Sequence, residues 1–280
     1  MVKGRFGTLK GKGVEIFSII SALIIWQLVA VYSVQNKFFL PSFTDVSLAF
    51  YSVITNVQTN FPLDMFLFSG EIPVPVLAVD LYYSLMHFFI GLVAALIIGI
   101  PVGMIMGWFK SVERVFDPLI EIVRPIPPLA WIPFAIIWIG LNPFGAGFLI
   151  FIGALFPIII NTFTGFKNIP KIYVEAAKVL GCNKDRDLIR QVALPSALPS
   201  IAAGIRIAMG VGWMCLVAAE MFGVSRNGLG FKIWHHYYLH NMDYVLVYML
   251  VLGFLGLLID KLLRGYIDGR LLKWRTGVVM

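Results

Sequence analysis

The chain has 280 residues, of which 59% are hydrophobic and only 13% are charged, and its 22 basic and 15 acidic side chains give a formal net charge of +7. A soluble globular domain carries roughly 25% charged residues, so this composition excludes a disordered chain and argues against a soluble enzyme. The two cysteines, Cys182 and Cys215, form neither a CxxC pair nor a paired spacing, which excludes a disulfide scaffold and a zinc finger. We therefore expect most of the chain to lie in lipid.

Windows without Asp, Glu, Lys or Arg predict the membrane spans. The window at residues 125–166 is 42 residues long. A span takes about 20 residues, so this window must hold two helices, joined by a turn at Gly140–Gly147. Counting it twice, we predict six transmembrane helices, in or near residues 16–36, 81–109, 125–166, 197–224 and 244–263.

The first of these spans could instead be a cleaved signal peptide, because a basic tail precedes it. Its apolar stretch is longer than a usual signal core, and no small-x-small cleavage site follows it. We therefore expect it to be retained as a membrane anchor.

The positions of Lys and Arg predict the orientation. With the N-terminus inside, 18 of the 22 basic residues lie on the cytoplasmic side, among them Lys110, Arg114 and Arg124, and three lie outside. This bias predicts that both termini are cytoplasmic. Because the charges are divided among four short segments, nucleic-acid binding is a poor interpretation.

Two of the predicted external segments have distinctive sequences. In residues 35–80, Ser42-Phe-Thr-Asp45 precedes apolar residues at helical spacing, which predicts a short amphipathic helix capped by Ser42 or Thr44. The other segment, residues 225–243, carries aromatic residues suited to the membrane interface. Within the first segment, residues 35–80, a stretch lying at the membrane surface is also predicted from Phe61, Met65, Phe66, Phe68 and Pro73.

These boundaries predict four regions along the chain. They are a cytoplasmic tail, a first helix with the external amphipathic segment, a five-helix core and a basic cytoplasmic tail, at residues 1–14, 15–79, 80–264 and 265–280.

No catalytic motif is present in the sequence. It contains no GxxxxGK[ST] run, so ATP binding through a P-loop is not expected. The cluster His235, His236 and His240 has no nearby Cys or Glu to complete a metal site, so interfacial polar residues are the better interpretation.

The second predicted span carries Gly99, Gly103 and Gly107, a repeated small-xxx-small stripe that allows another helix to approach closely. Pro101 lies within this stripe and is expected to bend the helix. The stripe could serve packing within one subunit or form a face that moves during gating.

The third predicted span begins with Arg124-Pro-Ile-Pro-Pro128 followed by Trp131-Ile-Pro133. Four prolines in nine residues cannot form a regular helix. Two interpretations remain open: a broken helix beside a passageway, with Pro128 and Trp131 near it, or a distorted helix end at the cytoplasmic interface.

Two charged residues interrupt the fifth span. Arg206 and Glu220 are 14 residues apart, which puts them on nearly the same helix face, roughly 20 Å apart. Charges inside a span usually face a bundle interior or a cavity, so both are candidates for a translocation pathway. Arg206 could equally snorkel to the cytoplasmic boundary, and Glu220 could be a structural hydrogen-bonding residue.

The segment between the fourth and fifth spans, residues 167–195, has the strongest local signals. Pro170 is expected to start a short helix and Gly181 to end it in a left-handed conformation. Asp185 and Asp187 favour the start of a second helix, which we expect to stop before Pro195. The alternative to such a cytosolic platform is an ordinary connecting loop.

This segment resembles a known motif. Glu175-Ala-Ala-x3-Gly181 followed by Leu194-Pro195 is similar to the EAA motif of ABC importer permeases. The likeness covers roughly residues 38 to 275 and points to the nitrate, sulfonate, taurine and bicarbonate group. Further matching stretches are Phe39–Ser42, Arg124–Pro133, Val217–Glu220 and Gly256–Asp260.

The resemblance implies an all-α membrane protein with six transmembrane helices, a type I ABC importer transmembrane domain in the inner cell membrane. It implies a dimer of permease subunits, expected to be a homodimer, over two ATPase subunits. An external binding protein delivers the substrate. Such a chain is not an enzyme and holds no cofactor, since ATP and Mg bind the partner ATPase. The residues implied to couple to the ATPase are Glu175, Ala176, Ala177, Gly181, Leu194 and Pro195.

The resemblance also implies a small solute. An anion such as nitrate, bicarbonate or a sulfonate is expected, and a heterocycle such as a thiamine precursor or riboflavin is the alternative. Two rival classes are less favoured. A secondary transporter would show intramembrane acid or base relays and often an internal repeat, and the sequence has Glu220 and Asp260 but no repeat. A membrane enzyme would need a catalytic cluster, and a structural scaffold would have no coupling platform.

Overall fold

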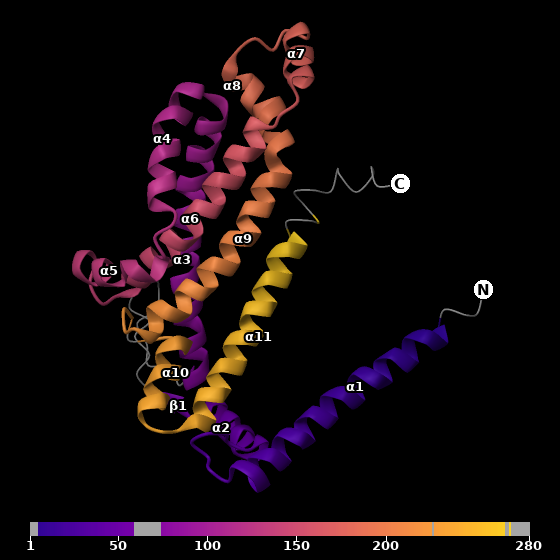
Figure 1. The fold of residues 1–280 in the computed structure, drawn as a ribbon, viewed down its shortest axis with the longest axis vertical. Helices are drawn as coiled ribbons and strands as arrows, with labels where there is room; N and C mark the ends of the chain where they lie inside the picture. The colour runs from indigo at the N-terminus through magenta and orange to yellow at the C-terminus, as the bar shows by residue number, and fades with distance from the viewer. Residues whose placement is uncertain (1–4, 59–73, 226, 267–268, 270–280) are drawn as a thin grey trace. The chain divides into compact units, whose positions relative to one another are not determined.

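The computed structural model describes residues 5–58, 74–225, 227–266 and 269, so the surface segment predicted from Phe61 to Pro73 lies outside the described residues. The protein is mainly helical (Figure 1). Its elements in chain order are α1 (Arg5–Leu28), η1 (Val29–Val34), α2 (Phe43–Thr55), β1 (Val57–Gln58), β2 (Val74–Pro75), α3 (Val76–Trp108), α4 (Lys110–Val123), η2 (Pro128–Trp131), α5 (Ile132–Trp138), α6 (Pro143–Lys167), α7 (Lys171–Val179), α8 (Asp185–Leu188), η3 (Ile189–Ala193), α9 (Leu194–Met221), α10 (Leu229–Tyr238) and α11 (Met242–Tyr266).

The chain divides into two compact units, which are described separately. The first comprises residues 1–79 and 232–251, and the second comprises residues 80–231 and 252–280.

In the first unit, α2 has the N-terminal cap predicted from the sequence. The Ser42 hydroxyl accepts the backbone N–H of Asp45, and the Asp45 carboxylate accepts the backbone N–H of Ser42, which makes a capping box. Lys37, 2.7 Å from Asp45, and the Ser42 hydroxyl lower the pKa of Asp45 below its ordinary value. The capping prediction is thus confirmed for Ser42.

The core of the first unit joins α2 to the start of α11. Val46 and Ala49 of α2 form a buried cluster with Val247 of α11. Beside it, the hydroxyls of Ser52 and Tyr244 lie 2.8 Å apart. The amphipathic pattern of α2 therefore buries its apolar face against a helix almost 200 residues away in sequence.

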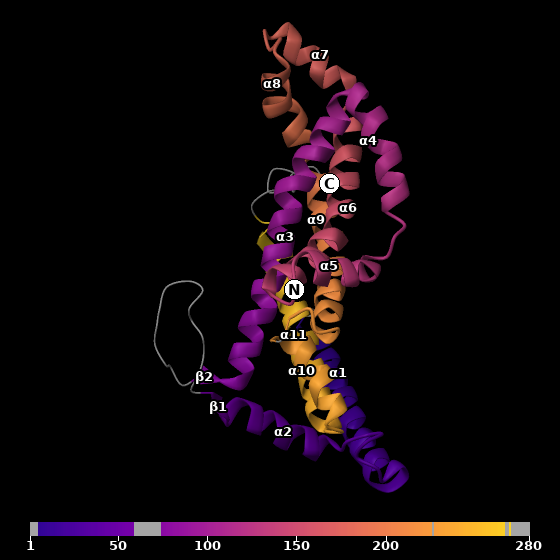
Figure 2. The ribbon, with the colours of Figure 1, turned by 90° about the vertical axis from the view of Figure 1, so that its left-hand side faces the viewer.

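In the second unit, α3, α6 and α9 run side by side (Figures 1 and 2). The glycines of α3 predicted for close packing face α6. A Cβ at Gly103 would lie 2.6 Å from the carbonyl oxygen of Ile159, and one at Gly99 would lie 2.9 Å from Ile158 Cγ2. The stripe therefore serves packing within this chain, where a side chain at these positions would collide with α6.

Five helical segments of the described chain are long and apolar enough to cross a membrane, and a bent pair can supply a sixth. That pair is α4 with the helical stretch Pro128–Trp138, and its two parts meet at 87°. The prediction of a third span that starts at residue 125 as one charge-free helix is therefore not met, because the prolines from Pro125 to Pro128 interrupt the helical backbone there.

The turn before α6 is shorter than predicted. Gly140 has a φ of 93°, and the Asn142 side chain accepts the backbone N–H groups of Phe144 and Gly145. Because this cap starts α6 at Pro143, Gly145 and Gly147 are helical residues. There, Gly145 and Gly147 allow close approach of neighbouring backbone and side chains.

The prediction that the helix begun at Asp185 stops before Pro195 is wrong. Residues Asp185–Met221 form one continuous helical run of 37 residues. In the π-helical turn η3, Leu194 N–H donates to the Ile189 carbonyl, five residues back. Pro195, which has no N–H to donate, directly follows this π-helical turn, and the helix continues through α9.

Candidate functional site

The segment predicted to couple to an ATPase forms a short helix at one end of α6 and α9 (Figures 1 and 2). Pro170 precedes α7, and Gly181, with φ 93°, follows it, both as predicted. The end is closed by two bonds, from Gly181 N–H to the Lys178 carbonyl and from Cys182 N–H to the Ala177 carbonyl. This is the Schellman arrangement, which requires the left-handed residue that glycine supplies.

The surface of α7 is unusually apolar for an exposed helix. None of its residues is buried. Val179 and Leu180 are 88% and 87% exposed, and Ile172 is 67% exposed. Contiguous exposed apolar side chains mark interaction sites more often than solvated faces.

The structure brings some of the predicted coupling residues together. Ala176 and Ala177 line a cavity of about 510 Å³ together with Leu180 and Pro195. Leu194 packs instead beside a buried cluster that includes Phe166. Glu175 and Gly181 are exposed and do not line this cavity.

The base of the platform is tied to the rest of the second unit. Phe166 at the end of α6 packs with Ala193, Ala197 and Ile201 in a buried cluster. The Lys167 ammonium lies 2.6 Å from the Glu113 carboxylate of α4. These contacts join the residues just before and after the α7–α8 segment to α4, α6 and α9.

Glu220, a candidate for the pathway, is fully buried in a hydrogen-bond network. The Ser84 hydroxyl lies 2.9 Å from each carboxylate oxygen, and His87 Nδ1 lies 2.8 Å from Oε1. The backbone N–H of Gly230 donates to Oε2 at 2.8 Å. Both Ser84 and His87 come from α3, so the network links α3 to the end of α9.

The loop after α9 joins the same network. The Ser84 hydroxyl accepts the backbone N–H of Leu229 at 2.9 Å, and the Ser225 hydroxyl lies 3.2 Å from His87 Nε2. A Cβ at Gly228 would collide with the Glu220 carboxylate. Ser84 and His87 were missed by the sequence analysis, since nothing local in sequence indicates a partner more than 130 residues away.

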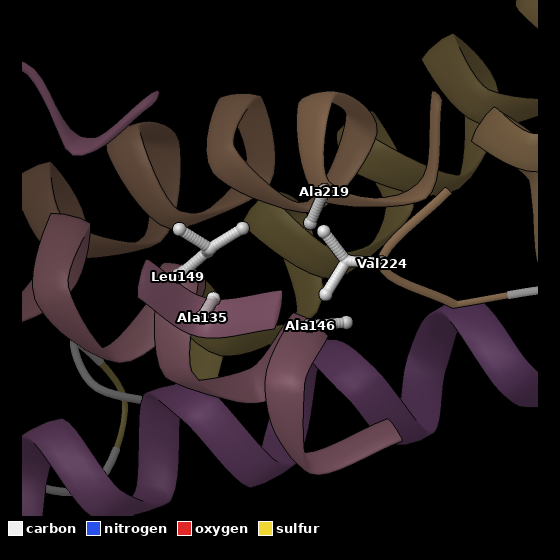
Figure 3. Close-up of a cluster of buried hydrophobic side chains, with 5 residues drawn as sticks. All are labelled: Ala135, Ala146, Leu149, Ala219 and Val224. Atoms are coloured by element: carbon white, nitrogen blue, oxygen red, sulfur yellow. The ribbon is translucent and has the colours of Figure 1, made fainter. Parts of the chain in front are cut away.

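Trp131 packs against a buried apolar cluster formed by Ala135, Ala146, Leu149, Ala219 and Val224, which Figure 3 shows between α5, α6 and the end of α9. Its indole Nε1 is buried and has no hydrogen-bond partner in the part of the chain that the structure describes. Trp131 therefore helps to hold α5 against α6.

A second cavity, of about 320 Å³, lies beside the middle of α6 and α9. Pro128, predicted near the pathway, is among its lining residues, whereas Arg206, Glu220 and Trp131 are not. Arg124, counted above with a cytoplasmic segment, also lines it, together with Asn161. Without Arg124, the charge bias remains 17 to three.

Comparison with known proteins identifies the family. The model of the binding-protein-dependent transport system inner membrane component matches residues 99–273. An ABC transporter permease protein of Methanocaldococcus jannaschii is 39% identical over 254 residues, which are 91% of this chain and 89% of that protein.

Two further relatives are named for the solute that they transport. The bicarbonate transport system permease protein of Synechococcus elongatus is 40% identical over 171 residues, 61% of each chain. The taurine transport system permease protein of Escherichia coli is 36% identical over 70% of each chain.

The fold has a counterpart among solved structures. An inward-facing structure of the MetNI methionine ABC transporter superposes with a TM-score of 0.60, at 21% identity, over 69% of this chain and 95% of that one. The predicted all-α architecture of a type I importer is thus confirmed. The chain belongs to the binding-protein-dependent transport system inner membrane components, the permease subunits of ABC importers.

Proposed function

We propose that two copies of this chain form the translocation pathway for a small anion, such as nitrate, bicarbonate or a sulfonate. An external binding protein delivers the anion, and two separate ATPase subunits drive its import. The chain itself does no covalent chemistry, because ATP and Mg bind the partner. The relatives named for bicarbonate, taurine and nitrate transport support an anion over a heterocycle.

The observation that carries this proposal is the exposed apolar surface of α7. Val179 and Leu180 are almost fully exposed. The backbone there is held by the hydrogen bonds of the helix cap, so these side chains are exposed on an ordered helix end. A partner that covers these side chains removes apolar area from water, which favours binding. Coupling then requires that the ATPase hold α7 differently in its open and closed states.

Orientation follows from the distribution of basic residues. Excess Lys and Arg between residues 167 and 190 predicts that α7 faces the cytoplasm, where ATP is available. Both termini then lie on the same side. A reporter fused after Trp274 should be cytoplasmic, and an external signal there would contradict the proposal.

The test is co-purification of the permease with its ATPase from cells that express both. Leu180→Asp should lose most of the bound ATPase, because it places a charge in the apolar contact. Asn183→Asp is the matched control, since it adds the same charge to an exposed position that does not line the cavity beside α7, and it should retain the ATPase. Equal recovery with both variants would contradict a docking role for α7.

A further inference from the structure

The cavity beside the middle of α6 and α9 is built by three elements of the second unit. The stretch from the end of α4 to the first residue of η2 contributes Arg124, Ile126 and Pro128, and α9 contributes Ile207 and Val211. The α6 lining runs from Ile152 to Asn161, the central part of a 25-residue helix. A helix of this length crosses a bilayer, so the cavity lies near mid-depth of the span.

Arg124 is the only charged residue among those that line the cavity in the described chain. Its side chain makes no ion pair with a carboxylate of the described residues. A charge at membrane depth is expensive unless it faces a bundle interior or water. The cavity thus needs either water or a counter-anion next to this guanidinium.

The backbone around the cavity is polar as well. Residues 124–127 are not helical, and non-helical backbone at membrane depth is tolerated where it is buried in protein or lines a water-filled cavity. Pro157 has no N–H, so the Gly153 carbonyl lacks its usual helical donor. The Asn161 amide donates to the Pro157 carbonyl at 2.8 Å, which orients this side chain at the wall.

We infer that this cavity holds the transported anion in passage and that Arg124 determines its preference for negative charge, an inference that rests on the function proposed above. The guanidinium offers five N–H donors and no acceptor, a geometry that suits oxyanions. The lining contains no carboxylate to compete for it. A volume of about 320 Å³ accommodates a small solute.

The first experiment measures uptake by the complete complex, with ATPase and binding protein, in proteoliposomes supplied with nitrate, bicarbonate or taurine. Arg124→Gln should lower uptake about 10-fold to 100-fold, as expected for loss of one charge-assisted contact. Arg124→Lys should retain much of the rate because it keeps the charge. Arg114→Gln removes an equal charge from α4 away from the cavity and should transport like the wild type.

If Arg124→Gln transports like Arg114→Gln, the inference is overturned. If the wild type imports none of these three oxyanion-bearing solutes, the proposed solute class fails instead.

A second experiment tests the cavity without a transported solute. In the assembled complex, with Cys182 and Cys215 replaced by serine and alanine, Asn161→Cys is exposed to thiol reagents of opposite charge. A negatively charged methanethiosulfonate should react about 10-fold faster than a positively charged one, because Arg124 attracts it. Adding Arg124→Gln should abolish this preference. Equal rates with Arg124 present, or no reaction with either reagent, would overturn the inference.

Discussion

The two ends of α9 differ in whether the side chains beside them are covered by this chain itself. At its far end, Glu220 is fully buried, yet Ser84, His87 and Gly230 all donate to or contact its carboxylate. Before its beginning, α7 and its C-terminal cap, which α8 and η3 connect to α9, leave Val179 and Leu180 almost fully exposed. The chain therefore satisfies its buried carboxyl group internally but leaves apolar surface for a partner to cover.

This difference predicts where substitutions act. Changes in the Glu220 network should lower the stability of the isolated permease, because they leave buried polar groups without partners. Changes on α7 should spare that stability and act on assembly and transport. The following predictions test this distinction, from the largest expected effect to the smallest.

Glu220→Ala should have the largest effect on stability. It removes one carboxylate and leaves the buried Ser84, His87 and Gly230 N–H each without one hydrogen-bond partner. Breaking such a buried set costs about 3–5 kcal/mol. Thermal unfolding of the purified permease should show a clear drop, with Glu220→Gln falling between it and the wild type. A melting temperature equal to that of the wild type would show that the network is dispensable.

Gly103→Val should be nearly as disruptive. The added Cβ would lie 2.6 Å from the Ile159 carbonyl oxygen, so α3 and α6 would have to separate. Overpacking of this kind costs about 1–3 kcal/mol or more. Gly210→Ala is the matched control, because a Cβ there meets nothing within 4 Å. The same unfolding measurement should give it wild-type stability or slightly higher, and equal losses for both would contradict the close-packing role.

Gly181→Val should separate coupling from folding. Gly181 has a φ of 93° with open space around it, so the variant suffers backbone strain of about 1–2 kcal/mol but no collision within the chain. Unfolding of the permease should change little, whereas substrate-stimulated ATP hydrolysis and uptake should fall. Glu175→Ala should be milder. Normal transport by an assembled Gly181→Val complex would show that α7 is only a loop.

His236 should give a smaller, pH-dependent effect. Its ring stacks on Tyr244 with centroids 4.7 Å apart, and burial, with help from His235 and Lys232, lowers its pKa to about 4. In the unfolded chain, His236 binds a proton near pH 6.5. The free energy of unfolding is therefore unaffected by His236 above that pH and declines as the pH falls toward 4, because the unfolded state takes up the proton first.

Thermal unfolding of the wild type and His236→Phe between pH 7 and pH 4.5 checks this. The aromatic replacement keeps the stacked ring but cannot take a proton, so its melting temperature should fall less on acidification. Parallel pH profiles would contradict the assigned role of His236.

The sequence alone determined several features, because each depends on interactions within a few residues. Ser42 and Asp45 form the cap of α2, and Gly181 ends α7 in the left-handed conformation. The glycine spacing of α3 correctly indicated a closely packed face. The charge-free windows found the long apolar helices, since hydrophobicity over about 20 residues needs no knowledge of neighbours.

Tertiary structure decided the features that depend on distant partners. Ser84 and His87 meet Glu220 across more than 130 residues, and no local pattern specifies that contact. In sequence, Pro195 predicts the end of a helix. In the structure, the π-helical turn η3 before it has hydrogen bonds that span five residues, and the helix continues. Arg124 looks like a boundary charge, but the bend after α4 brings it beside the middle of α6. In each case packing between helices selects one of several locally allowed conformations, and only the folded chain supplies those contacts.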